Sequence, residues 1–202
     1  MLGTTVRVDV RVPFLLDCVS ALLPRLNETD ETTVPSMAAS TILSLLHAVR
    51  ACEDQSDADL GMIGPDRLVD TVRAILHVVC AAGSLTSASM RYDLYLSVVC
   101  AVQMVLRTSA APRMHSLLVA HADNLVHVLA RDALDGSDVM QTVALTTLSH
   151  LVAWDATKGT ASMRVGERLA SAGYMKRLVL RSPELDRPLQ ATRGPDLALF
   201  HS

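Results

Sequence analysis

Apolar residues recur at intervals of three and four along most of this 202-residue chain, in successive segments of helical length. An α-helix has 3.6 residues per turn, so this spacing gathers each apolar set on one face of a helix. Short polar, glycine or proline breaks separate the segments and predict where the helices end. We expect helices at 12–26, from Pro35 to the acidic loop at 53–64, from Pro65 to Gly83, at 89–106, between Pro112 and the turn at 135–137, at 138–154, a short one ending at Gly173, and at 174–180.

The apolar residues favour helices packed on helices. Hydrophobic residues make up 50% of the chain but aromatic residues only 3%, so the core is built from aliphatic side chains. Consecutive antiparallel helices form either a bundle or a stacked solenoid. Wide apolar stripes, as on the helix at 138–154, indicate a helix sandwiched between neighbours and favour the solenoid. We therefore predict an all-α, HEAT- or armadillo-like α-solenoid over 1–181, about seven to eight helices, and a poorly structured or truncated tail at 182–202. Alternating valines from Val6 to Val12 predict one short extended segment.

The charge pattern argues against two classes of partner. The net charge is −3, and the 18 Lys and Arg residues are scattered along the chain. A protein that binds nucleic acid through its phosphates usually carries a clustered basic face, so we expect no direct nucleic-acid binding. The longest segments without a formal charge include 32–49, 94–106 and 139–154. The segment 94–106 is too short to span a bilayer. The other two segments contain Gln, Thr, Ser, His or Pro residues, which are unfavourable in a transmembrane helix.

The histidines and cysteines do not have the spacing of a metal site. His115, His121 and His127 are six apart, so each is rotated by about 120° from the last on a helix. His77 and Cys80 could share a face, but two ligands are too few. His121 lies on an apolar stripe and is expected to be a hydrogen-bonded core histidine. The four cysteines are distant in sequence and are expected to be unpaired; they are Cys18, Cys52, Cys80 and Cys100.

No motif predicts catalysis or a cofactor. The carboxylates around 132–138 lack the ligand spacing of a calcium-binding loop, and Asp135 and Asp138 fit a turn and a helix N-terminus instead. No nucleophile elbow and no phosphate-binding glycine loop occurs in the chain. Tyr95, Trp154 and Tyr174 stand in apolar helical settings, which predicts core packing. The sequence therefore predicts a non-enzymatic protein without a cofactor.

Three segments resemble the largest α-solenoid scaffold nucleoporins of the nuclear pore inner ring. They are Arg91-Tyr92-Asp93-Leu94-Tyr95, Ala130-Arg131-Asp132-Ala133-Leu134-Asp135-Gly136, and Ser171-Ala172-Gly173-Tyr174-Met175-Lys176 followed by Leu178-Val179. Their joint order carries the resemblance, which spans about 91–179. The residues that carry it as expected packing and turn elements are Arg91, Leu94, Tyr95, Arg131, Asp132, Asp135, Gly136, Gly173 and Tyr174.

The resemblance implies a structural role at the nuclear pore complex of the nuclear envelope. Members of that family are non-enzymatic scaffolds, and they bind short helical segments of other scaffold or linker nucleoporins. They are much longer than 202 residues, so the resemblance implies a fragment from the C-terminal half of such a protein. The alternative is a soluble HEAT- or armadillo-type transport receptor or interaction adaptor, which is built from the same helix packing.

Overall fold

The computed structural model describes residues 11–28, 33–55, 64–81, 87–156 and 163–178. These residues are almost entirely helical, because each segment carries an apolar stripe at the helical period. The elements are α1 (Arg11–Leu22), the 3-10 helix η1 (Leu23–Asn27), α2 (Thr33–Gln55), α3 (Pro65–Ala81), α4 (Ala88–Val105), α5 (Ala111–Asp135), α6 (Asp138–Ala156) and α7 (Val165–Ser171). Residues 174–178 are also helical.

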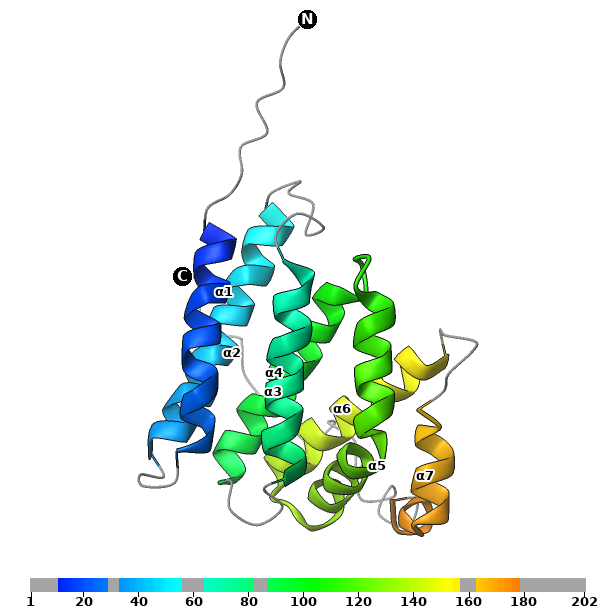
Figure 1. Ribbon diagram of the computed structural model, residues 1–202. Coiled ribbons are helices and arrows are strands. Elements are labelled where there is room, and N and C mark those ends of the chain that lie inside the picture. The colour runs from blue at the N-terminus through cyan, green and yellow to red at the C-terminus, as the bar shows by residue number, and fades with distance from the viewer. Residues whose placement is uncertain (1–10, 29–32, 56–63, 82–86, 157–162, 179–202) are drawn as a thin grey trace, which may run out of the picture.

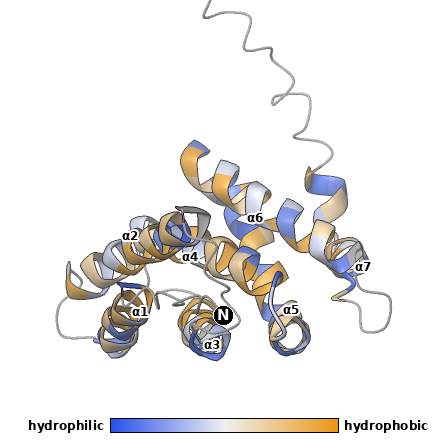
Figure 2. Ribbon diagram, turned by 90° about the horizontal axis from the view of Figure 1, so that it is seen from above, coloured by the Kyte–Doolittle hydropathy of each residue, from blue (hydrophilic) through white to orange (hydrophobic). Residues whose placement is uncertain are grey.

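The helices stack in two layers. Seen from above, α1, α3, α5 and α7 form one row, and α2, α4 and α6 form a second row (Figure 2). Each helix packs against the second helix along the chain, which belongs to its own layer, and the two layers are joined by contacts between consecutive helices such as α1 with α2, α3 with α4 and α5 with α6. We call the first row the odd layer and the second the even layer. This arrangement confirms the predicted all-α, solenoid-like stacking of antiparallel helix pairs (Figure 1).

The helix α4 forms the centre of the array. It packs against α2, α3 and α6, and most of its side chains are buried on every side. A helix covered in this way reads as a nearly continuous apolar run, which is what residues 94–106 show. Its N-terminus is capped by Ser87, whose hydroxyl accepts a hydrogen bond of 3.1 Å from the backbone N–H of Met90.

Several predicted helix boundaries are wrong, and prolines account for two of the differences described next. The first helix does not continue to residue 26, because it tightens into η1 around Pro24, which has no N–H to donate to the preceding turn. The second helix begins at Thr33, so Pro35 is its third residue rather than its first. This position still lies in the first turn, where backbone N–H groups have no partner within the helix. The sixth helix runs on to Ala156 instead of ending at Trp154.

Two further predictions concern the chain ends. The extended segment is wrong at its last two positions, since Arg11 and Val12 begin α1 and Val12 is buried in the core. Apolar burial outweighs local β-propensity there. The rest of that segment, together with Gly83, Val179, Leu180 and the predicted tail, lies outside the described residues.

The helix α6 lies between neighbouring helices, but it is not covered on every side. Its inner side packs against α4 and α5, and it contacts α7. However, Val139 and Val152 are 63% and 47% exposed. The outer side of α6 is polar without being charged, because threonine and serine hydroxyls occupy it and bond to carbonyls of the preceding turn, as Thr142, Thr146 and Ser149 do.

Candidate functional site

The three segments that carry the resemblance meet on the second half of α5. The segment around Arg91 and Tyr95 opens α4, the segment around Asp132 ends α5 itself, and the segment around Tyr174 follows α7. Each of the first and third segments contacts a polar side chain of α5. Helix α5 is the longest of the described helices, and it packs against α3, α4, α6 and α7. We refer to this set of contacts as the α5 junction.

Asp132 is the polar centre of the α5 junction, and its side chain is only 4% exposed. Its Oδ2 accepts a hydrogen bond of 2.8 Å from Nε of Arg91 and another of 2.8 Å from the hydroxyl of Tyr95. Nε of Arg131 lies 3.7 Å from the other carboxylate oxygen. A buried carboxylate is tolerated only with such charged and hydrogen-bonding partners. Leu94 lies fully buried between the two α4 residues that reach Asp132.

The hydroxyl of Tyr95 is held in its neutral form. Burial raises its pKa far above the ordinary value, and the negative charge of Asp132 and the hydrogen bond to that residue raise it further. The guanidinium groups of Arg91 and Arg131 act in the opposite direction. Tyr95 therefore remains a hydrogen-bond donor at every physiological pH, and this arrangement ties α4 to α5 rather than preparing a proton for transfer.

Gly136 shapes the turn between α5 and α6. Its N–H donates to the carbonyl of Asp132 at 3.1 Å, and its own carbonyl accepts 2.8 Å from Nε2 of Gln141. A Cβ at this position would collide with the carbonyl oxygen of Asp132 and would lie 2.9 Å from Cβ of Met140. Glycine is required here by space, since its φ of −75° suits any residue. The absence of a side chain at Gly136 thus allows the start of α6 to pack closely against the end of α5.

The third segment contacts the second half of α5 through Tyr174 and Arg177. Gly173 has a φ of +73°, the left-handed conformation with which glycine ends many helices. The chain then places the hydroxyl of Tyr174 2.6 Å from Nδ1 of His127. Nη2 of Arg177 lies 3.2 Å from Oδ1 of Asp135 in an exposed ion pair. Tyr174 is therefore half-buried against α5 rather than inside the core, where Tyr95 and Trp154 lie.

The sequence did not reveal a second group of contacts, which crosses the odd layer. Arg67 of α3 pairs with Asp17 of α1 at 2.5 Å. Asp66 of α3 pairs with Arg113 of α5, and Asp123 of α5 pairs with Arg168 of α7. No motif marks these residues, because each partner is chosen by the stacking of helices far apart in sequence. Charged residues at exposed positions of α1, α3 and α5 were the only signal available.

The chemistry available in the described part of the chain is that of packing. Within it, no three His, Cys, Asp or Glu side chains gather as ligands of a metal ion would. His121 is half-buried, and its Nδ1 lies 3.0 Å from the carbonyl oxygen of Leu117 in its own helix. None of the described helices is both long and apolar enough to span a bilayer.

Comparison with known proteins identifies the sequence family. A family model described as the nuclear pore complex scaffold, nucleoporins 186/192/205, matches residues 3–197. The match includes the first ninety residues, to which the three motif segments do not extend. No curated protein gives a significant match to the chain, and neither does any solved structure.

Proposed function

Because the chain belongs to the nuclear pore complex scaffold family of nucleoporins 186/192/205, we propose that it binds other nucleoporins and so supports nucleocytoplasmic transport. The family is a structural one, located at the nuclear pore complex of the nuclear envelope, and is not an enzyme family. The observation that carries the proposal is the match over 3–197 on a chain whose helices stack in two layers. Such an array presents a long, preformed surface to its partners.

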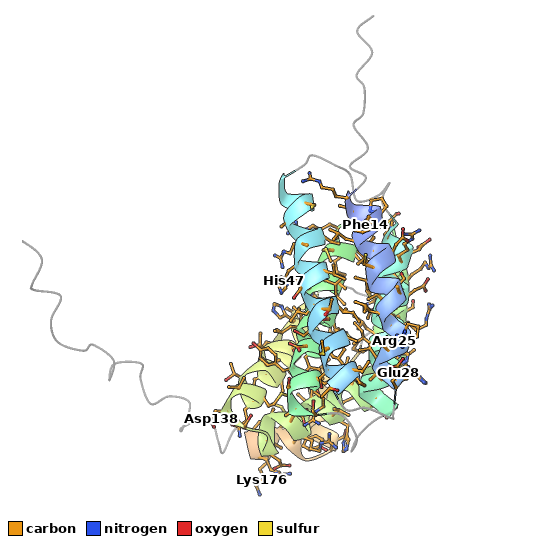
Figure 3. All side chains as sticks on the ribbon, turned by 90° about the vertical axis from the view of Figure 1, so that its left-hand side faces the viewer. Phe14, Arg25, Glu28, His47, Asp138 and Lys176 are labelled. Atoms are coloured by element: carbon orange, nitrogen blue, oxygen red, sulfur yellow. The ribbon has the colours of Figure 1, made fainter. Side chains whose placement is uncertain are left out.

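The partners we propose are short helical segments of other scaffold or linker nucleoporins, and the outer side of the even layer is the surface we assign to them. Figure 3 looks onto the first helix pair, where His47 projects from the side of α2 that is turned away from α1. From Thr33 to Val49 in α2 and from Val139 to Trp154 in α6 there is no Asp, Glu, Lys or Arg. The exposed side chains that form this surface are Met37, Ser40, Thr41, Ser44 and His47 of α2, and Val139, Thr142, Thr146, Ser149 and Val152 of α6.

The hydroxyl groups on this surface make its desolvation inexpensive. Those of Thr41 and Ser44 donate to carbonyls four residues earlier, at 2.8 and 3.0 Å, and the hydroxyls of α6 do the same. When a partner helix covers these hydroxyl groups, they keep their hydrogen bonds to the backbone carbonyls, so no donor is left without an acceptor. The outer side of the odd layer differs, because arginine and aspartate side chains occupy it and would lose hydration under an apolar partner.

We also propose that the α5 junction is structural. Arg91, Tyr95, Arg131 and Asp132 form a buried polar link between α4 and α5. Gly136 and Gly173 fix the two turns that bring α6 and Tyr174 against α5. The junction sets the relative positions of helices that line the proposed binding surface.

The first test is imaging in living cells of the tagged full-length product of the parent gene, followed by photobleaching. A punctate nuclear rim with very slow recovery is expected for a pore scaffold. Diffuse signal or fast recovery would contradict the scaffold role. It would favour the soluble transport receptor or adaptor, which shares the same two-layer helix stacking.

A pair of matched variants tests the binding surface. Ser44→Glu puts a charge on the even layer, and Ser116→Glu puts the same charge on the odd layer. Both serines are exposed, and each hydroxyl donates 3.0 Å to the carbonyl four residues earlier. We expect Ser44→Glu to weaken co-purification with pore scaffold proteins, and Ser116→Glu to leave it unchanged. Equal effects would contradict the assignment of the even layer.

A further inference from the structure

The first turn of α3 reaches in two directions across the odd layer. Arg67 extends to α1, where its Nη1 lies 2.5 Å from Oδ1 of Asp17 and 3.5 Å from the carbonyl oxygen of Pro13. The preceding residue, Asp66, extends to Arg113 at the start of α5. Adjacent residues point about 100° apart on a helix, so one turn can bridge both neighbours. A single helical turn therefore holds charged contacts to α1 and to α5.

The two layers differ in how extensively their first two helices pack against each other. In the even layer, α2 packs along much of α4, and Nη1 of Arg50 donates 2.7 Å to Oε1 of Gln103 in a partly buried contact. In the odd layer, α1 meets α3 over a much shorter stretch. The link between α1 and α3 consequently depends more on the exposed contacts of Arg67.

We propose that Asp66 and Arg67 form an electrostatic clamp that sets how far apart the odd-layer helices α1, α3 and α5 stand. When salt screens the clamp, α1 and α2 rotate together about the contact between α2 and α4. The distance between α1 and the other odd-layer helices then increases. The even layer keeps its spacing. The inference does not depend on which proteins the array binds, because it concerns the internal geometry of the chain.

The solvent exposure of the paired side chains supports a different response of the two layers to salt. The Arg67 and Asp17 side chains are 47% and 64% exposed, and Arg113 and Asp66 are exposed to a similar degree. Exposed pairs are weak, and salt screens them over a Debye length of about 10 Å at 0.1 M and about 3 Å at 1 M. Apolar contacts such as those between α2 and α4 are not screened by salt. Raising the ionic strength therefore acts on one layer of the array.

The experiment measures distances within the purified chain by double electron–electron resonance. Spin labels are attached through ketone-bearing amino acids, which leaves the four cysteines in place. One label pair, at Ala21 of α1 and Ala120 of α5, reports on the odd layer. A second pair, at Ser44 of α2 and Thr146 of α6, reports on the even layer; all four positions are exposed.

We expect the odd-layer distance to shift to longer values between about 0.1 and 1 M NaCl, while the even-layer distance stays constant. Arg67→Gln should give the longer distance already at low salt and lose most of the salt response. Arg73→Gln is the matched control, because Arg73 pairs at 2.5 Å with Asp70 of its own helix, and this pair does not link two helices. The charge exchange Asp17→Arg with Arg67→Asp should restore the short distance.

Either of two results would overturn the clamp. One is an odd-layer distance that is the same at both salt concentrations in the unmodified chain. The other is an equal response of Arg67→Gln and Arg73→Gln. The salt titration of the labelled chain needs no change at Asp17, Asp66, Arg67 or Arg113, so it decides the question even if a clamp variant folds poorly.

Discussion

The hydroxyl of Tyr95 donates a hydrogen bond of 2.8 Å to Oδ2 of Asp132, and the same oxygen accepts 2.8 Å from Nε of Arg91. Two α4 side chains one turn apart thus converge on one α5 carboxylate. The three residues come from two segments that are separated by about forty positions in the sequence and that both carry the resemblance. The structure gives that pair of segments a physical reason to occur together.

Asp132→Ala should destabilise the chain strongly. It leaves the largely buried guanidinium of Arg91 without its carboxylate partner and the Tyr95 hydroxyl without its acceptor. Breaking a buried ion pair from one side typically costs about 3 kcal/mol or more. The free energy of unfolding in urea measures the loss. Asp66→Ala, which breaks an exposed pair, should cost less than about 1 kcal/mol. Similar losses in both variants would contradict the importance of burial.

Tyr95→Phe should flatten the alkaline limb of the stability profile. The folded chain raises the pKa of Tyr95, chiefly by burial, above its unfolded value of about 10. The contribution of this group is therefore fully present below pH 10 and is lost progressively as the pH rises above it. Urea unfolding at pH 9, 10 and 11 should show a steeper fall for the unmodified chain than for the variant. Parallel curves would mean that the hydroxyl titrates normally.

Gly136→Ala and Gly166→Ala should have opposite effects. At Gly136 the added Cβ meets the backbone carbonyl of Asp132, which cannot move without displacing the end of α5, so we expect a loss of about 1–3 kcal/mol. At Gly166, in α7, the added Cβ meets nothing within 4 Å, and alanine should stabilise the helix by about 0.5 kcal/mol. Thermal and urea unfolding of both variants checks the sign of each change. A stabilised Gly136→Ala would show that the turn relaxes freely.

Cys80 should be slow to alkylate in the folded chain. Burial raises the pKa of its thiol from 9.0 to about 11. Two pKa units lower the thiolate fraction about a hundredfold at neutral pH, and the thiolate is the reactive form. Iodoacetamide labelling at pH 7.5, followed by mass spectrometry of the Cys80 peptide, should be about a hundredfold slower in buffer than in urea. Equal rates in the two conditions would contradict the burial of this thiol.

The sequence predicted the helices and their stacking because both depend on apolar spacing. The stripes on α3 and α4 lie in the core as expected, including Val72, Ile75 and Val98. Helix ends were predicted less well, because a proline can lie inside the first turn, as Pro35 does, or tighten the last turn, as Pro24 does. These outcomes depend on which backbone groups the neighbouring helices leave uncovered.

The partners of charged residues could not be predicted from the sequence. Asp132 was singled out through a resemblance, but its contact with Arg91 depends on how α4 crosses α5. The adjacent Asp66 and Arg67 belong to no motif, and they contact different helices. Val139 and Val152 were expected to be covered, and nothing in their periodicity distinguishes an outer helix of a layer from an inner one.

The pattern of helix contacts also bears on how the chain is made. The packing contacts of each helix are with helices one or two steps away in the sequence. A nascent chain can therefore complete the surroundings of α1 once α3 has left the ribosome, and those of α2 once α4 has followed. Short sequence separation between contacting residues also favours rapid folding. Synthesis and folding can thus advance together from the N-terminus, and each new helix finds its docking site already formed.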